Sequence, residues 1–363
     1  MKKLIISTCG TSIFTAESSS EVRKLLTDYA NAGKESDIAP EHLPILQARI
    51  NFCQNELAAQ KNIDELAKIS AELNGLRGCY GGTISGNDHH ILLATDTWLG
   101  EQSAKAIEAV LQHYGQSTEV KRQTDLRTDD LSAYRMALSE LVKWAYDTLP
   151  DYRSQGYRII FNLTGGFKAV QGFMQTLGML HADECVYVYE RSDELIRLPR
   201  LPIKMDARTD IEKYLTPFRR MAEMQLEVSS EDVRGVSESF LMTIDNKSTL
   251  SEWGQMVWQE TKDALYEEKL HSSPSKKLKF GKIFESSLKG LEKKRLREVN
   301  AKIDALARYI ETNQSLLSLD FKPIKGKSGW YEADAWHDGD AKRLYGYYEG
   351  DVFVVDNLEK ALH

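Results

Sequence analysis

The chain has 363 residues, of which 42% are hydrophobic, and a formal net charge of −7. This length leaves room for two or three domains, and the composition is that of a globular chain. No apolar run approaches the roughly 20 residues that span a bilayer, and the polar start does not fit a signal peptide. These features exclude a membrane or secreted protein, and we expect a cytoplasmic one.

The four cysteines lie far apart in the sequence. None belongs to a Cys-x-x-Cys pair or has a histidine nearby, as a zinc site or a disulfide framework would require. We therefore expect reduced, structural thiols and no metal site: Cys9, Cys53, Cys79 and Cys185.

Strands and helices alternate over the first 200 residues. Apolar runs predict strands at 3–8, 90–97, 118–121, 157–161 and 185–189, and helical periodicity predicts helices near 104–111, 131–146 and 167–180. Residues 16–73 are polar and helix-favouring, so we interpret them as a helical insertion. The alternation predicts an α/β fold of the Rossmann-like, doubly wound type, with a parallel sheet covered by helices.

Polar clusters follow three of these strands. In such a sheet, ligands bind outside the carboxyl ends of the strands, at the point where the strand order reverses. Glycines let a ligand approach the backbone, helix starts attract anions, and lysine adds a point charge. We therefore predict an anion site built from Gly10, Thr11, Ser12, Asp96, Thr97, Asn162, Thr164, Gly165, Gly166 and Lys168.

The turn around Gly165 has an alternative interpretation without a ligand. Its spacing is not that of a phosphate-binding P-loop, so it could be a tight strand-to-helix turn capped by Thr164. Within the predicted site, Asp96 is an unusual neighbour for a phosphate, and we expect it to contact sugar hydroxyls or to cap a helix.

The alternation stops near residues 203–210. We predict three domains, at 1–205, 206–275 and 276–363. The middle segment is predicted to be helical and carries no assignable chemistry, and residues 272–275 are predicted to be a linker. The last segment has amphipathic helical periodicity over 288–310, followed by strands at 330–336, 343–348 and 352–355.

Residues 276–308 carry an excess of about seven positive charges in an otherwise acidic chain. Such asymmetry indicates contact with a polyanion. The alternative is a solvated helix face.

The N-terminal region resembles the CARF domain, the CRISPR-associated Rossmann-like sensor of cyclic oligoadenylates. The motifs that carry the resemblance are Ser7 to Ser12, Asn162 to Lys168, and the segment Leu198-Pro199-Arg200-Leu201-Pro202-Ile203. The resemblance implies a two-fold homodimer that binds cyclic tetra-adenylate at the polar clusters.

The C-terminal region is similar to RelE-type toxin ribonucleases, through the basic helices, the segment from Leu319 to Gly326, and the strands that begin at Trp330 and Lys342. Together the two regions resemble the CRISPR-associated CARF–RelE mRNA interferases of type III systems. The implied function is a ribosome-dependent endoribonuclease that cyclic tetra-adenylate activates and that shuts down translation in antiviral defence.

The second resemblance also implies roles for individual residues. Arg343 falls where the family has its phosphate-binding arginine, Lys322, Lys325 and Lys327 would hold RNA backbone, and Tyr345 or Tyr347 would stack on a base. Members of the family often carry lysines on the first hairpin strand, but here that strand reads Trp330-Tyr331-Glu332-Ala333-Asp334. His337 is our candidate for the base, because histidine titrates near neutral pH.

The expected partners are a second copy, cyclic tetra-adenylate and mRNA on the ribosome, with no cofactor, membrane or DNA. Two alternatives stay open: a DNA-binding transcription regulator that uses residues 210–270, and a ribonuclease that does not need the ribosome. A dinucleotide enzyme is disfavoured, because the turn after the first strand lacks Gly-x-Gly-x-x-Gly.

Overall fold

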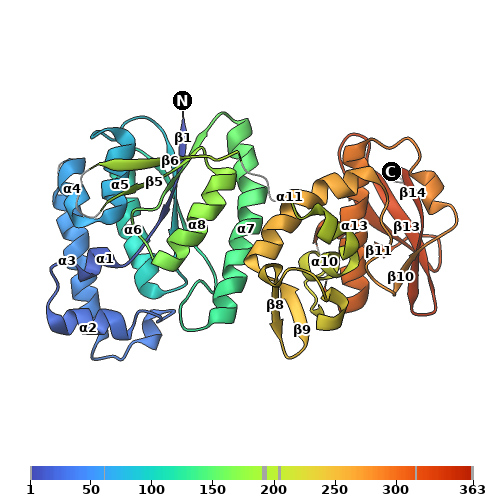
Figure 1. The fold of residues 1–363 in the computed structure, drawn as a ribbon, viewed down its shortest axis with the longest axis horizontal. Coiled ribbons are helices and arrows are strands. Elements are labelled where there is room, and N and C mark those ends of the chain that lie inside the picture. Colours follow the sequence, from blue (N-terminus) through green and yellow to red (C-terminus); the bar gives the residue numbers. More distant parts are fainter. Residues whose placement is uncertain (1, 61, 190–193, 203–205, 315–316, 361–363) are drawn as a thin grey trace. The chain divides into compact units, whose positions relative to one another are not determined.

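A computed structural model describes residues 2–60, 62–189, 194–202, 206–314 and 317–360 (Figure 1). The chain divides into two compact units, residues 1–204 and 205–363. We call them the first and the second unit. None of the described helices combines the length and the apolar character needed to cross a bilayer.

The first unit is built on a six-stranded sheet with the order β3-β2-β1-β4-β5-β6. The strands from β1 to β5 are parallel, and β6 is antiparallel to β5. The α/β prediction is confirmed, although β6 was not predicted as a strand. The strand bounds are β1 Lys3–Thr8, β2 His89–Ala94, β3 Ser117–Arg122, β4 Arg158–Asn162, β5 Glu184–Val188 and β6 Leu195–Pro199.

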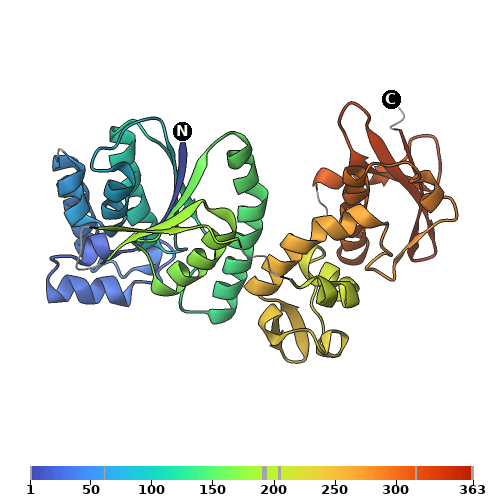
Figure 2. The same cartoon turned by 45° about the horizontal axis from the view of Figure 1, so that its top comes forward.

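Helices cover both faces of this sheet, with α5 and α6 on one side and α7 and α8 on the other (Figures 1 and 2). Ile5, Leu92 and Ile160 form one core with residues of α3, α5 and α6. The predicted insertion at 16–73 is mainly helical and contributes α2, α3, α4 and the start of α5. The helices are α1 Ser12–Thr15, α2 Ser20–Asp28, α3 Leu43–Ala59, α4 Ile63–Ile69, α5 Ala71–Tyr80, α6 Trp98–His113, α7 Leu131–Ser154 and α8 Lys168–His181.

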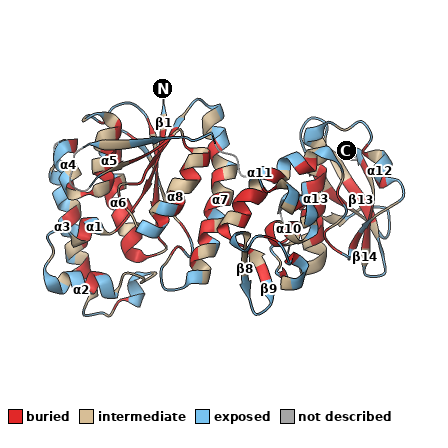
Figure 3. Cartoon of the chain, in the orientation of Figure 1, coloured by how far each residue is buried: buried red, intermediate tan, exposed pale blue. Residues whose placement is uncertain are grey.

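The central strands are buried on both faces (Figure 3). This explains why they are continuous apolar runs rather than alternating ones. The chain adds β2 on one side of β1 and β4 on the other, and Ser7 pairs with Asn162 across β1 and β4. The order therefore reverses at β1, which places the ligand-binding crevice of this fold class beside the turns after β1 and β4.

The second unit begins with a mixed segment rather than the purely helical one that was predicted. Its short sheet has the order β7-β9-β8. Asp245 and Asn246, both with positive φ, form the tight turn of the β8–β9 hairpin, and these residue types suit that geometry. The elements are α9 Arg208–Lys213, α10 Leu215–Ala222, β7 Val228–Ser229, β8 Leu241–Ile244, β9 Lys247–Leu250 and α11 Glu252–Glu268.

The rest of the second unit is a five-stranded sheet with the order β10-β14-β13-β12-β11, in which β10 pairs parallel to β14 and the other pairs are antiparallel. Residues of the long helix α13 share a core with this sheet. The three predicted strands and the hairpin turn at Gly350 are present. The elements are β10 Leu278–Phe280, α12 Phe284–Ser287, α13 Lys293–Thr312, β11 Lys322–Pro323, β12 Trp330–Trp336, β13 Lys342–Glu349 and β14 Val352–Lys360.

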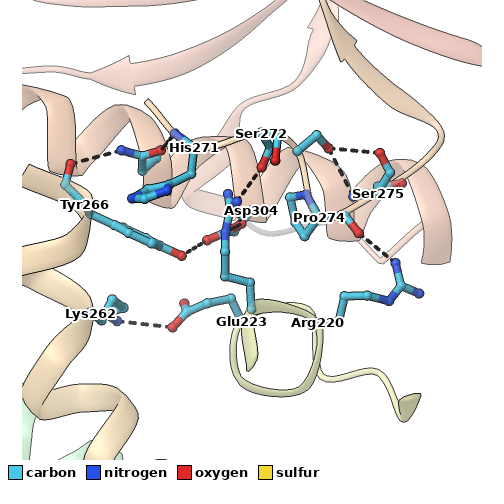
Figure 4. Close-up of polar contacts among 12 residues, drawn as sticks. Arg220, Glu223, Lys262, Tyr266, His271, Ser272, Pro274, Ser275 and Asp304 are labelled. Carbon is cyan, nitrogen blue, oxygen red and sulfur yellow. Dashed lines mark hydrogen bonds and ion pairs between the residues drawn. The ribbon is translucent and has the colours of Figure 1, made fainter. Parts of the chain in front are cut away.

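A buried ion pair joins the two parts of the second unit (Figure 4). The Arg219 Nε of α10 donates to Asp304 Oδ1 of α13 at 2.8 Å, and both side chains are 1% exposed. The Tyr266 hydroxyl of α11 donates to the other oxygen of Asp304, and Arg219 also donates to the carbonyl of Ser272. The expected separation at 275/276 is therefore corrected: residues 206–275 pack into one unit with the C-terminal sheet.

Candidate functional site

A pocket of about 690 Å³ opens in the first unit where β1, β4 and β5 end. We call it the switch-point pocket. Two of the three predicted polar clusters meet there, those after β1 and β4. Seven predicted residues line it: Gly10, Thr11, Ser12, Thr164, Gly165, Gly166 and Lys168.

Glycine is required where the two turns touch. A Cβ on Gly10 would lie 2.9 Å from the backbone nitrogen of Gly166, closer than real Cβ atoms come. Gly166 has a φ of +100°, and a Cβ there would meet Thr8 at 2.9 Å. The Thr8 hydroxyl donates to the Gly165 carbonyl at 2.5 Å and ties the turns together. Side chains are thus kept off the backbone at the pocket floor.

The turn after β4 presents unused donors. Among the described residues, no acceptor bonds the backbone N–H of Gly165, Gly166 or Phe167. Helix α8 follows directly, without a side-chain cap at its start. Lys168 is exposed and makes no ion pair within the described part of the chain. Free N–H groups, a helix start and an unpaired ammonium all favour a bound anion.

Asn162 supports the pocket from below rather than lining it. Its side chain is fully buried, and its Nδ2 donates to the Glu72 carbonyl at 2.9 Å and to Ser7 Oγ at 3.2 Å. Its Oδ1 accepts from the Thr164 hydroxyl at 2.9 Å. Its predicted ligand contact is therefore corrected to a role in orienting Thr164.

Asp96 and Thr97 do not belong to the switch-point pocket. Asp96 accepts from Arg122 Nε at 2.9 Å and from the Asp125 backbone N–H at 3.0 Å. Thr97 is buried and caps α6 through the Gly100 N–H. Their predicted contacts with ligand are corrected, because the turn after β2 uses its polar groups to fix its own neighbours.

A buried carboxylate that sequence reasoning missed lies between the two turns. Glu72 Oε1 accepts from the Gly10 N–H at 2.8 Å, and Oε2 accepts from the Ser70 hydroxyl at 2.7 Å. Burial raises the pKa of Glu72, although these hydrogen bonds oppose the shift. A Cβ on Gly165 would lie 2.0 Å from Oε1. Glu72 therefore holds the pocket floor, and nothing in its helical sequence context indicates this.

Two tyrosines that were not predicted as ligand contacts also line the pocket. Tyr187 and Tyr189 stand at the end of β5, and Tyr189 is 57% exposed. The signal was present, because the predicted strand 185–189 ends at the same sheet edge as the glycine turns. Aromatic rings beside an anion site are suited to stack on nucleobases.

In the second unit, Arg343 is surrounded by carboxylates. Its Nη1 lies 2.6 Å from Glu332, and its Nη2 lies 2.8 Å from both Asp320 and Asp334. Lys322 Nζ lies 2.5 Å from Asp320. Partial burial lowers the pKa of Arg343, but the bond to Asp320 and the nearby carboxylates outweigh it and raise the pKa. We call these five residues the Arg343 cluster.

His337 and Arg343 line a common pocket of about 440 Å³. Asp334, Asp338, Asp340 and Lys360 complete most of its wall. The structure therefore brings together the predicted base and the predicted phosphate-binding arginine. The surroundings are acidic, because Asp338 and Asp340 join the Asp334 of the first hairpin strand in the pocket wall. Among the described residues, no group of histidine, cysteine or acidic side chains is arranged to hold a metal ion.

The other predicted ribonuclease residues do not line the pocket of His337 and Arg343. Tyr345 is 6% exposed and donates to the Lys360 carbonyl, so its predicted stacking role is corrected. Tyr347 is partly exposed and packs against Trp330 at 5.1 Å between ring centroids. Lys325 is exposed on the loop after β11, and Lys327 lies over the Trp330 ring.

The basic segment is only partly neutralised. Arg295 pairs with Glu298 and Asp338, and Arg297 pairs with Asp263. Helix α13 has no side-chain cap, and lysines rather than acids occupy its first turn. Six exposed lysines form no ion pair within the described ranges: Lys276, Lys277, Lys282, Lys289, Lys293 and Lys294. The charges of Lys293 and Lys294, in the first turn of α13, oppose the helix dipole, which favours an anionic partner.

Residues 67–201 match a family model described as CRISPR-associated protein (Cas_APE2256). The match indicates a CRISPR-associated protein family. It spans α5 to β6, and so includes Glu72, the turn after β4 and the tyrosines of β5. The matched span is less than half of the chain and stops before the second unit. No curated protein matches the chain.

Proposed function

We propose that the first unit is a sensor that binds cyclic tetra-adenylate in the switch-point pocket. The observation that carries this proposal is the turn after β4, where the helix start has no side-chain cap and where the N–H groups and Lys168 have no partner among the described residues. These donors suit phosphate, and the neighbouring tyrosines suit adenine rings. The CRISPR-associated family match of the same residues supports a signalling nucleotide over a metabolite.

The proposed sensor is a homodimer. A ring of four identical nucleotides has two equal halves, so two copies related by a two-fold axis would each offer the same pocket to one half. Tyr189, which lines the pocket of a single copy, is exposed to solvent.

The second unit is proposed to be a metal-independent endoribonuclease that acts on mRNA in the ribosome. Such cleavage needs removal of the proton from the 2′-OH, attack of that oxygen on phosphorus, and departure of the 5′ oxygen with a proton. Arg343 would neutralise the phosphate, and His337 in the same pocket would take the 2′ proton. The products would be a 2′,3′-cyclic phosphate and a 5′-OH end.

The composition of residues 206–275 disfavours the regulator alternative. This segment contains eight lysines and arginines against fourteen aspartates and glutamates. DNA binding depends on neutralising phosphates with cations, so an acidic segment of this kind is poorly suited to it.

The test measures cleavage of one mRNA in purified translating ribosomes, with and without cyclic tetra-adenylate, beside the same RNA free in solution. We expect cleavage only when ribosome and activator are both present. Arg343→Ala should abolish cleavage and leave activator binding unchanged. Cleavage of the free RNA would establish the ribosome-independent alternative, and no cleavage in any condition, with activator bound, would overturn the ribonuclease assignment.

A further inference from the structure

The three carboxylates around Arg343 are not equivalent. Glu332 and Asp334 stand on β12, directly across from β13, and their side chains are 11% and 19% exposed. Asp320 lies just before β11, outside any strand, and its side chain is 41% exposed. The first two are fixed by the sheet, whereas Asp320 can leave Arg343 without disturbing a strand.

Asp320 also occupies the position that an RNA phosphate would need. One oxygen, Oδ2, lies 2.8 Å from Arg343 Nη2 and 2.5 Å from Lys322 Nζ. Arg343 is the cation that the proposed function places against the phosphate, and Lys322 is one of the lysines that the family resemblance assigns to the RNA backbone. A carboxylate and a phosphate use the same charge-assisted hydrogen bonds to such donors, so the two groups compete for one place.

The backbone and the local charge agree with a displaceable contact. Asp320 has a φ of +41°, in the left-handed region that most side chains avoid. The Arg343 cluster holds three carboxylates and two cations, so its formal charge is −1 and it repels RNA. Without the charge of Asp320 the cluster is neutral, and Arg343 Nη2 and Lys322 Nζ each lose one carboxylate contact.

We propose that Asp320 is an internal substitute for the RNA phosphate, which keeps Arg343 and Lys322 occupied until substrate displaces it. This inference rests on the ribonuclease function proposed above. Asp320 is a positioning residue that sets the threshold for RNA binding, and it takes no part in bond cleavage.

The test uses the full-length protein and a short fluorescein-labelled RNA made uncleavable by 2′-deoxy substitution. Asp320→Asn removes the charge, keeps the shape and tolerates the left-handed backbone. We expect it to bind this RNA about 1.5- to fivefold more tightly than the unaltered protein, the range for losing one exposed ion pair. Glu268→Gln is the matched control, since it neutralises a carboxylate of the second unit that is similarly exposed, pairs with Arg208 at 2.7 Å and does not line the pocket of Arg343.

Further variants separate the possible failures. Asp320→Gly, which suits the positive φ, should reproduce the gain and excludes a folding effect. If Arg343→Ala weakens RNA binding but Asp320→Asn does not strengthen it, the substitute role is overturned and the RNA site stands. If Arg343→Ala has no effect either, the RNA site and this inference both fail. Weaker binding by Asp320→Asn would make Asp320 part of the RNA site and would also overturn the proposal.

The translating-ribosome assay supplies the second readout. We expect Asp320→Asn to cleave mRNA without cyclic tetra-adenylate, at a rate several-fold above that of the unaltered protein. Activator-dependent cleavage with no rise in the basal rate of Asp320→Asn would refute the substitute role while leaving the proposed function intact.

Discussion

Removing the charge of Lys168 is the sharpest test of the switch-point pocket. Lys168 opens α8, lines the pocket and forms no ion pair among the described residues. Two unit charges about 4 Å apart are worth roughly 1 kcal/mol in water and about 4 kcal/mol at a partly shielded surface. Because Lys168 is exposed, the lower part of this range applies. We expect Lys168→Ala to lose about 1–2 kcal/mol per copy, hence about 2–4 kcal/mol for a ring held by two copies, or roughly 30- to 900-fold in affinity.

Isothermal titration of cyclic tetra-adenylate at two salt concentrations measures this effect. Lys168→Arg keeps the charge and should retain most of the affinity, and Lys24→Ala removes an exposed lysine of α2 that does not line the pocket. The loss in Lys168→Ala should shrink at high salt, because the interaction is screened. Affinity of Lys168→Ala within twofold of the unaltered protein at low salt would remove Lys168 from the site.

Two stability predictions follow from buried groups. Asp304→Asn leaves the buried guanidinium of Arg219 without its counter-charge, so the second unit should lose about 3–5 kcal/mol, measured as faster hydrogen exchange in α10, α11 and α13. The exposed pair of Glu268 with Arg208 is the control, and Glu268→Gln should leave this exchange unchanged; equal exchange in both variants would contradict the reasoning. Burial lowers the pKa of His90 to about 3, so between pH 6.5 and 3 the unfolded chain binds a proton that the folded chain does not. Stability is therefore full above pH 6.5 and falls below it, by about 2 kcal/mol at pH 5, and His90→Gln should remove this part of the pH dependence in urea titrations.

The strands and helices of the first unit could be predicted from the sequence because the patterns that indicate them lie within short segments. Strands buried on both faces are continuous apolar runs, and the glycines after β1 and β4 are needed where two backbones touch. The antiparallel β6 was missed, since a strand of exposed and half-buried residues at a sheet edge carries no apolar run.

The sequence could not show which hydrogen bonds and ion pairs form between residues that are far apart in the chain. Glu72 lies on a helix of the insertion, 62 positions from the Gly10 N–H that it accepts from. Asp96 was predicted to contact ligand because it lies at the end of a strand. In the structure its carboxylate instead accepts a hydrogen bond from Arg122 at the end of β3. In the same way, Arg343 lies on the expected strand, but its ion pairs with Asp320 and Glu332 determine whether its guanidinium can bind a phosphate.

The two candidate sites differ in their readiness for an anion. Within the described ranges, the switch-point pocket presents N–H groups and a lysine without partners, so an anion would not have to displace a protein group there. The Arg343 cluster must give up a carboxylate before it can take a phosphate, which raises the free energy of RNA binding. A protein that binds its signal readily and its substrate reluctantly stays inactive until the substrate is presented at high local concentration. Within the proposed function, the ribosome would supply that presentation, and the occupied Arg343 cluster would be the reason for the ribosome requirement.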